Sequence, residues 1–133
     1  MHPKLTEINE VEKFERLLAA SGKRPLLIFK YSATCGTSAQ ALDELFAHLN
    51  EHPADATYAI VTVQTHRDVS NAIARTLGIR HETPQALLIR DGRVVWSASH
   101  YRVTSEAVES ALKEALNDAS DGAARPRLQP TLP

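Results

Sequence analysis

The side chain best suited to chemistry is the thiol of Cys35, the only cysteine in the 133 residues. It opens the segment Cys35-Gly-Thr-Ser38, which has the spacing of a C-x-x-C redox motif with serine in the second position. A dithiol site resolves a mixed disulfide with its own second thiol, and serine cannot do this. The segment therefore predicts a monothiol site. A single cysteine also excludes an internal disulfide and a cysteine-rich zinc site within one chain.

The position of Cys35 between two expected elements favours a reactive thiol. An apolar, strand-like run at 26–31 precedes it, and a helical pattern begins at about Ser38. Unpaired backbone N–H groups at a helix start and the positive end of the helix dipole both favour a thiolate. We therefore predict that Cys35 is a redox-active nucleophile. The residues expected to support it are Thr34, Gly36, Thr37 and Ser38.

The effect of a helix-start position on the reactivity of a thiol can be estimated. A fall in thiol pKa from about 8.5 to about 7 raises the thiolate fraction at neutral pH roughly fifteen-fold. The nucleophilicity lost at the same time, with a Brønsted slope of about 0.4–0.5, removes roughly five-fold of that gain. The larger benefit comes when the cysteine must leave again as a thiolate, which suits a thiol that is loaded and unloaded repeatedly.

Composition and charge restrict the class of protein. With 43% apolar residues, 23% charged residues and a net charge of −1, the chain is typical of one soluble globular domain. The near-neutral charge gives no reason to expect nucleic acid or a membrane surface as a partner. No apolar run is long enough to span a membrane, and the first residues lack the apolar core of a signal peptide. We therefore expect a cytoplasmic protein.

Hydrophobic periodicity divides the chain into helices and strands. Helices are expected at 5–21, 38–50, 68–77 and 105–116. Strands are expected at 26–31, 57–64, 86–89 and 93–97, the last two joined by a tight turn at Asp91-Gly92. Residues 1–118 are expected to form one domain. Residues 119–133, which are rich in Ala, Pro, Arg and Gly, are expected to form a disordered tail.

This order of elements predicts an α/β fold with a mixed four-stranded sheet and helices on both faces. It is the order of a thioredoxin-like fold with an extra N-terminal helix. In such folds a cis-proline precedes the third of these strands and faces the active cysteine, and the backbone of the preceding residue is free to pair with a substrate. Thr83 and Pro84 occupy that place. We therefore expect a cis bond and a substrate-binding role there.

The six histidines do not predict a metal site. His48 and His52 are four residues apart but straddle a helix end before Pro53, and no carboxylate clearly converges on them in the sequence. His81 and His100 are expected in loops on the cysteine side of the sheet. They are candidate site residues, with solvated loop histidines as the equally good alternative.

Two segments of the chain resemble a known family. They are Arg80-His-Glu-Thr-Pro-Gln-Ala-Leu-Leu-Ile89 and Asp91-Gly-Arg-Val-Val-Trp-Ser-Ala-Ser-His100, and Thr34-Cys35 with Ser38 fits the same pattern. Together they are similar to the YtxJ-like monothiol bacilliredoxins, over about residues 5–116. The resemblance implies that Cys35 removes bacillithiol from bacillithiolated protein cysteines. It implies no bound cofactor, with bacillithiol as co-substrate. The implied partners are bacillithiolated cytosolic proteins, and bacillithiol or a reductase for recycling.

The chain departs from this family beside the cysteine. The family usually has Thr-Cys-Pro-x-Ser, whereas Gly36 stands here in place of the proline and Thr37 in place of an apolar residue. Glycine has no preset φ but supplies an N–H that proline lacks. The sequence leaves open whether this raises or lowers the pKa of Cys35.

Two other functions stay open at this stage. Cys35-Gly-Thr-Ser38 differs at one residue from the Cys-Gly-Phe-Ser of monothiol glutaredoxins, which carry [2Fe–2S] clusters between two subunits with glutathione. Against that reading, the double glycine that binds glutathione near the last helix of those proteins is absent. The third reading is a thioredoxin-fold interaction module without turnover.

Overall fold

The computed structural model describes the backbone of residues 1–122 and side chains up to residue 117. Its strands are β1 (Leu5–Glu7), β2 (Leu26–Tyr31), β3 (Thr57–Thr62), β4 (Gln85–Arg90) and β5 (Arg93–Ser99). Its helices are α1 (Val11–Ala19), α2 (Gly36–Glu51), α3 (Arg67–Leu77) and α4 (Ser105–Gly122), with the short 3₁₀ turns η1 (Ala20–Gly22) and η2 (His100–Arg102). The strands form one mixed sheet in the order β1-β3-β2-β4-β5.

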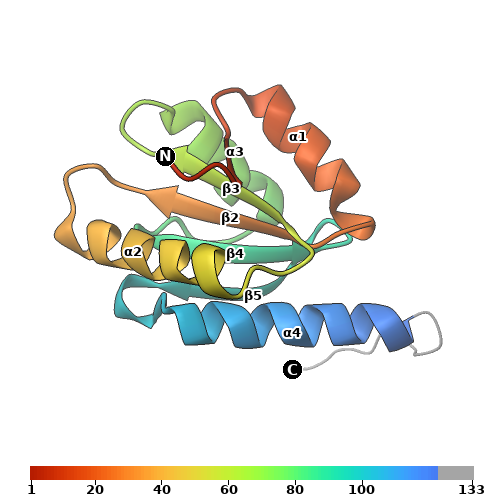
Figure 1. The fold of residues 1–133 in the computed structure, drawn as a ribbon. Coiled ribbons are helices and arrows are strands. Elements are labelled where there is room, and N and C mark those ends of the chain that lie inside the picture. Colours follow the sequence, from red (N-terminus) through yellow and green to blue (C-terminus); the bar gives the residue numbers. More distant parts are fainter. Residues whose placement is uncertain (123–133) are drawn as a thin grey trace.

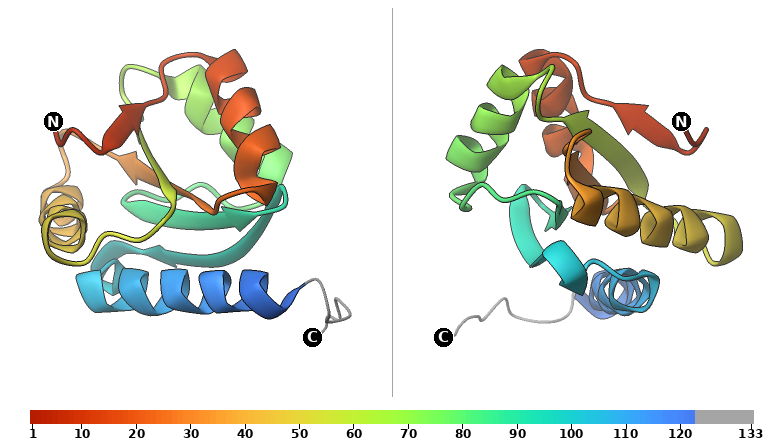
Figure 2. Two further views of the ribbon diagram at one scale, coloured as in Figure 1. Left: turned by 45° about the vertical axis from the view of Figure 1, so that its right-hand side comes forward. Right: turned by 90° about the vertical axis from the view of Figure 1, so that its left-hand side faces the viewer.

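Helices cover both faces of this sheet, with α1 and α3 on one face and α2 and α4 on the other (Figures 1 and 2). The central strand β2 is buried on both faces, as its nearly continuous apolar run predicts. Leu27 and Phe29 pack into the core beneath α2 and α4. Leu26 and Ile28 pack into the core beneath α1 and α3. This alternation fixes which face each later residue of β2 must meet.

The N-terminal segment differs from the prediction. The expected helix at 5–21 is a three-residue strand, β1, followed by a shorter helix that begins at Val11. The sheet therefore has five strands and not four. Leu5 pairs with Tyr58 of β3, and the N–H of Ile8 donates to the carbonyl of Ile60 at 2.9 Å. Apolar residues at 5, 8 and 11 also fit helical spacing, so only the distant partner strand decides the outcome.

The other expected elements are present with small shifts in their bounds. α3 ends at Gly78, whose φ of 64° is the left-handed conformation that glycine adopts readily. Asp91 and Gly92 have φ values of 54° and 75°, as the two-residue hairpin turn between β4 and β5 requires. α4 reaches Gly122, so the first four residues of the expected tail are helical. The remaining residues, 123–133, lie outside the described part of the chain.

One edge of the sheet gathers the residues that the sequence singles out. β2 ends at Tyr31 and leads through a short loop to α2, which begins beside that end of the sheet (Figure 1). β4 is antiparallel to β2, with Gln85 opposite Lys30. Continuing this register by one residue places Pro84 beside Tyr31. The segment before β4 and the loop that carries Cys35 therefore lie at the same edge.

Candidate active site

Cys35 is the N-cap residue of α2. Its backbone is extended, with φ −107° and ψ 122°, and its carbonyl accepts from the N–H groups of Ser38 and Ala39 at 3.1 and 3.3 Å. Its own N–H donates to the carbonyl of Ser32 at 3.3 Å, which closes the loop before the helix. The thiol is partly exposed and makes no disulfide. A strand, a tight loop and a helix start thus hold a partly exposed thiol.

The first turn of α2 lowers the pKa of the Cys35 thiol. The largest cause is the backbone N–H of Ser38, followed by that of Thr37, and the hydroxyls of both residues add smaller effects in the same direction. Partial desolvation opposes them. Donors pointing at sulfur stabilise the thiolate more than the thiol, so the pKa falls. The pKa direction agrees with the sequence-based expectation for a cysteine at a helix start.

Ser38 has a second task in this arrangement. Its side chain is fully buried, and its Oγ accepts the N–H of Ser32 at 3.1 Å. A thiol in this position would be a weaker acceptor for that buried donor. The hydroxyl therefore fastens the start of α2 to the end of the preceding loop.

The structure also resolves the effect of Gly36. The N–H groups that lower the pKa of Cys35 belong to Thr37 and Ser38, and not to Gly36. The extended conformation of Cys35 is the one that a residue before proline prefers. A Cβ added at Gly36 would meet nothing within 4 Å. The N–H that Gly36 supplies and proline would lack is therefore not among the groups that stabilise the thiolate.

Gln64, which the sequence analysis did not select, holds the cysteine loop from the turn just past the end of β3. Its Oε1 accepts the N–H of Ala33 at 3.1 Å. Its Nε2 donates to Ser32 Oγ at 2.6 Å and to Thr34 Oγ1 at 3.1 Å. All three residues between β2 and Cys35 are thus bound by one side chain. The sequence feature that could have indicated Gln64 is its position as a polar residue just past the carboxyl end of the strand beside β2, where functional sites tend to form.

The Thr83-Pro84 bond is cis, as predicted. The carbonyl of Pro84 accepts the N–H of His100 at 2.9 Å, which attaches η2 to this segment. Within residues 1–122 the backbone of Thr83 makes no hydrogen bond. Its N–H and C=O are therefore available to an incoming chain at the edge that also holds the thiol.

The two candidate loop histidines have different surroundings. His81 turns toward the α3 side of the sheet, where its Nδ1 lies 3.0 Å from Lys30 Nζ and 3.3 Å from Ser70 Oγ. His100 has a left-handed backbone, with φ 57°, and its Nδ1 lies 4.0 Å from Glu82 Oε1. Neither side chain contributes to the pKa of Cys35. His81 precedes the cis-proline by three residues, and the backbone N–H of His100 donates to its carbonyl.

The carboxylate of Glu82 is held in its charged form beside this segment. Its pKa is lowered first by a hydrogen bond from the side chain of Ser99; partial desolvation opposes this, and interactions with His100, Arg80 and Arg102 lower it further. These side chains come from the loop before β4, the end of β5 and η2. Charged groups therefore surround the cis-proline segment, whereas the thiol itself is stabilised by backbone and hydroxyl groups.

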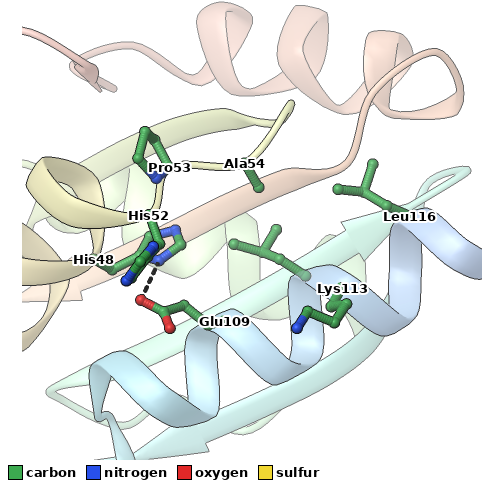
Figure 3. Close-up of a pocket in the computed structure, with 8 residues that line it drawn as sticks. His48, His52, Pro53, Ala54, Glu109, Lys113 and Leu116 are labelled. Carbon is green, nitrogen blue, oxygen red and sulfur yellow. Dashed lines mark hydrogen bonds and ion pairs between the residues drawn. The ribbon is translucent and has the colours of Figure 1, made fainter.

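A separate cavity of about 490 Å³ lies at the other end of α2, between that helix and α4 (Figure 3). His48 and Glu109 meet there, with Nδ1 and Oε2 at 3.3 Å, and His52 lies beside them (Figure 3). His48 Nε2 also lies 2.7 Å from the hydroxyl of Tyr58. Among the described residues no three His, Cys, Asp or Glu side chains are arranged to hold a metal ion. His48 lies thirteen residues along α2 from Cys35, which places this cavity roughly 20 Å from the thiol.

Comparisons with known proteins show the family and the fold of the chain. Residues 6–108 match the family described as monothiol bacilliredoxin BrxC. A solved structure described provisionally as an oxidoreductase with a thioredoxin fold is similar, with 28% identity and a TM-score of 0.72 over 80% of this chain and 92% of that one. Mitochondrial thioredoxin 3 from Saccharomyces cerevisiae, at 19% identity, has a TM-score of 0.64 over 83% and 94%. A thioredoxin from Fasciola hepatica, at 16%, has 0.66 over 83% and 98%. The last two share the fold.

Proposed function

Because the chain belongs to the monothiol bacilliredoxin family, we propose that it removes bacillithiol from S-bacillithiolated cysteines of other proteins. Membership of this family and a thioredoxin-type oxidoreductase fold support a thiol redox role in general. The observation that supports the proposal most strongly is the partly exposed Cys35 at the start of α2. Its thiolate is stabilised by the first turn, and the chain has no second cysteine.

The reaction consists of two thiol–disulfide exchanges. The Cys35 thiolate attacks the bacillithiol sulfur of the mixed disulfide, so a new S–S bond forms as the protein–bacillithiol S–S bond breaks. The target cysteine leaves as a thiolate and takes a proton from water. A second thiolate then attacks the bacillithiol sulfur now bonded to Cys35, and Cys35 leaves as a thiolate. Each step exchanges one disulfide for another, so no other oxidant or reductant is needed.

The chain's own groups support each step. The N–H groups of Thr37 and Ser38 stabilise Cys35 as the attacking thiolate and again as the leaving group. The unpaired backbone of Thr83 offers a donor and an acceptor to the target chain. The chain has no second cysteine, so the bacillithiol on Cys35 must be removed by another molecule.

We further propose where and with what the protein works. Bacillithiol serves as a co-substrate, and no cofactor is bound permanently. The partners are bacillithiolated cytoplasmic proteins, together with bacillithiol or a reductase that regenerates the thiol. Among the described residues no helix is long and apolar enough to cross a membrane.

The test uses a purified protein carrying a single bacillithiolated cysteine. After mixing with wild-type protein, intact mass spectrometry should show bacillithiol transferred to Cys35 and the target restored to its free thiol. Cys35→Ser, which keeps the size of the side chain, should acquire nothing. The proposal is wrong if wild type forms no adduct, or if Cys35→Ser forms it equally well. Visible absorbance bands after anaerobic iron–sulfur reconstitution would instead support a cluster carrier.

A further inference from the structure

Lys30 occupies an unusual place for a lysine. On β2 it follows Leu26 and Ile28 on the face toward α1 and α3, and these two other β2 residues on that face are apolar. Its relative exposure is 0%, so the ammonium group lies below the surface. Lysine is almost never fully buried without a partner, because the charge loses its hydration. The buried ammonium group of Lys30 should therefore have a hydrogen-bond partner.

That partner is a histidine and not a carboxylate. Lys30 Nζ lies 3.0 Å from His81 Nδ1, and no ion pair joins Lys30 to an acid among the described residues. An ammonium can only donate, so His81 Nδ1 must accept and its ring must be neutral, with the proton on Nε2. Ser70 Oγ of α3 lies 3.3 Å from the same nitrogen. This bond ties the loop before β4 to the central strand.

A second buried side chain holds the same loop. Gln85 is directly opposite Lys30 in the β2–β4 register, so both side chains are on one face of the sheet. It is 3% exposed, its Nε2 donates to the carbonyl of Arg80 at 3.0 Å, and its Oε1 has no partner within the described chain. Two buried polar residues at apolar positions thus reach one loop, at a cost in stability. That loop leads directly into Thr83-Pro84.

We propose that Lys30 is a positioning residue which, through His81, holds the loop at residues 80–84 in place for the target protein. This inference rests on the proposed function, because it assigns the loop to target recognition. The bond to His81 is strongest while Lys30 is charged and His81 is neutral. Recognition of protein targets should therefore depend on pH separately from the thiol.

The groups around the pair set the pH range. Burial lowers the pKa of Lys30 to about 8. The pKa of His81 is lowered by burial, then by the charges of Lys30 and Arg67, and Glu82 partly offsets this. Near pH 7 the lysine is therefore mostly charged and the histidine mostly neutral. Above about pH 8 the lysine loses its proton and the hydrogen bond loses its charge assistance.

The experiment compares two substrates from pH 6.5 to 9.5. One is a protein mixed disulfide, and the other is the small symmetric 2-hydroxyethyl disulfide. The ratio of their kcat/KM values cancels the titration of Cys35. In wild type this ratio should fall above about pH 8. In Lys30→Met it should be about ten-fold lower at pH 7.5, mainly through KM, and flat with pH, as expected for a lost charge-assisted hydrogen bond.

Three further variants sharpen the test. Lys30→Gln retains N–H donors without titrating, so part of the ratio should return while its pH dependence stays flat. His81→Leu removes the acceptor at an exposed position and should reproduce the Lys30→Met defect even if that variant folds poorly. Lys23→Met changes an exposed lysine and should match wild type.

The outcomes separate this inference from the proposed function. If Lys30→Met and His81→Leu keep the wild-type ratio and pH profile while wild type reacts with the protein disulfide, the positioning role is wrong and the proposed function stands. If wild type reacts with the small disulfide alone, both are overturned.

Discussion

Removing the side-chain amide of Gln64 should loosen the loop that carries Cys35. Gln64→Met keeps the length of the side chain and loses its bonds to Ser32, Ala33 and Thr34. A hydrogen bond contributes a net 0.5–1.5 kcal/mol, and the exposure of Gln64 argues for the lower end. Three such bonds amount to roughly 1.5 kcal/mol, which corresponds to about a ten-fold change in the opening equilibrium of the loop.

Hydrogen exchange measures this opening directly. The N–H of Cys35 donates to the carbonyl of Ser32, a bond that the substitution does not remove. The exchange rate of this N–H therefore reports how often the loop opens, and not the loss of the Gln64 hydrogen bonds themselves. In Gln64→Met it should rise about ten-fold. The alkylation midpoint of Cys35 should also move upward in pH, because an open loop takes the thiol away from the N–H groups of Thr37 and Ser38.

Two comparisons make the result decisive. Gln64→Glu keeps an acceptor for the N–H of Ala33 but loses both donors, and it adds a negative charge near the thiol. It should raise the alkylation midpoint further than Gln64→Met. Gln40→Met changes an exposed glutamine of α2 and should behave as wild type. Unaltered Cys35 exchange and midpoint in Gln64→Met would refute the reasoning.

Two other substitutions test the local structure. Gly36→Pro should stabilise the fold by about 0.4–1 kcal/mol in urea unfolding, because the backbone of Cys35 already has the conformation that a residue before proline prefers. The alkylation midpoint of Cys35 should stay unchanged, because the N–H groups that stabilise the thiolate belong to Thr37 and Ser38. A shifted midpoint would contradict this. His48→Gln should reduce the loss of unfolding free energy between pH 7.5 and 5.5. The folded-state pKa of His48 lies below its ordinary value, mainly because the side chain is buried. As the pH falls, the unfolded chain therefore binds more protons than the folded chain, and the free energy of unfolding decreases. An unchanged pH slope would show that His48 does not carry this effect.

Local patterns were sufficient to predict most of the fold. β2, the hairpin at Asp91-Gly92 and the end of α3 at Gly78 follow from apolar runs and from positions that need positive φ. The strand β1 could not be predicted, because three residues acquire strand structure only by pairing with β3, more than fifty positions away. The same segment read alone has acceptable helical spacing. Its structure is decided by tertiary contacts and not by propensity.

Some residues of the site could likewise be predicted from the sequence, and others could not. Cys35, Ser38 and the cis bond at Thr83-Pro84 could be anticipated from order along the chain. Gln64 could not, because its three bonds depend on the side-by-side placement of β3 and β2. Lys30 lies within a run whose burial was expected, yet nothing in that run indicates a bond to His81, fifty-one positions later.

Under the function proposed above, activation of the thiol and recognition of the target have separate physical bases. The pKa of Cys35 is lowered by backbone N–H groups and hydroxyls, with no charged side chain of the described chain among its causes. Charged residues gather instead around the segment before β4, where the charges of Arg80 and Arg102 lower the pKa of Glu82, and where Lys30 is buried. Substitutions in this charged group should change binding without changing the thiolate, because neutral donors in the first turn of α2 keep the thiol activated. Under the function proposed above, one helix start supplies the nucleophile and the loop at residues 80–84 selects the protein target.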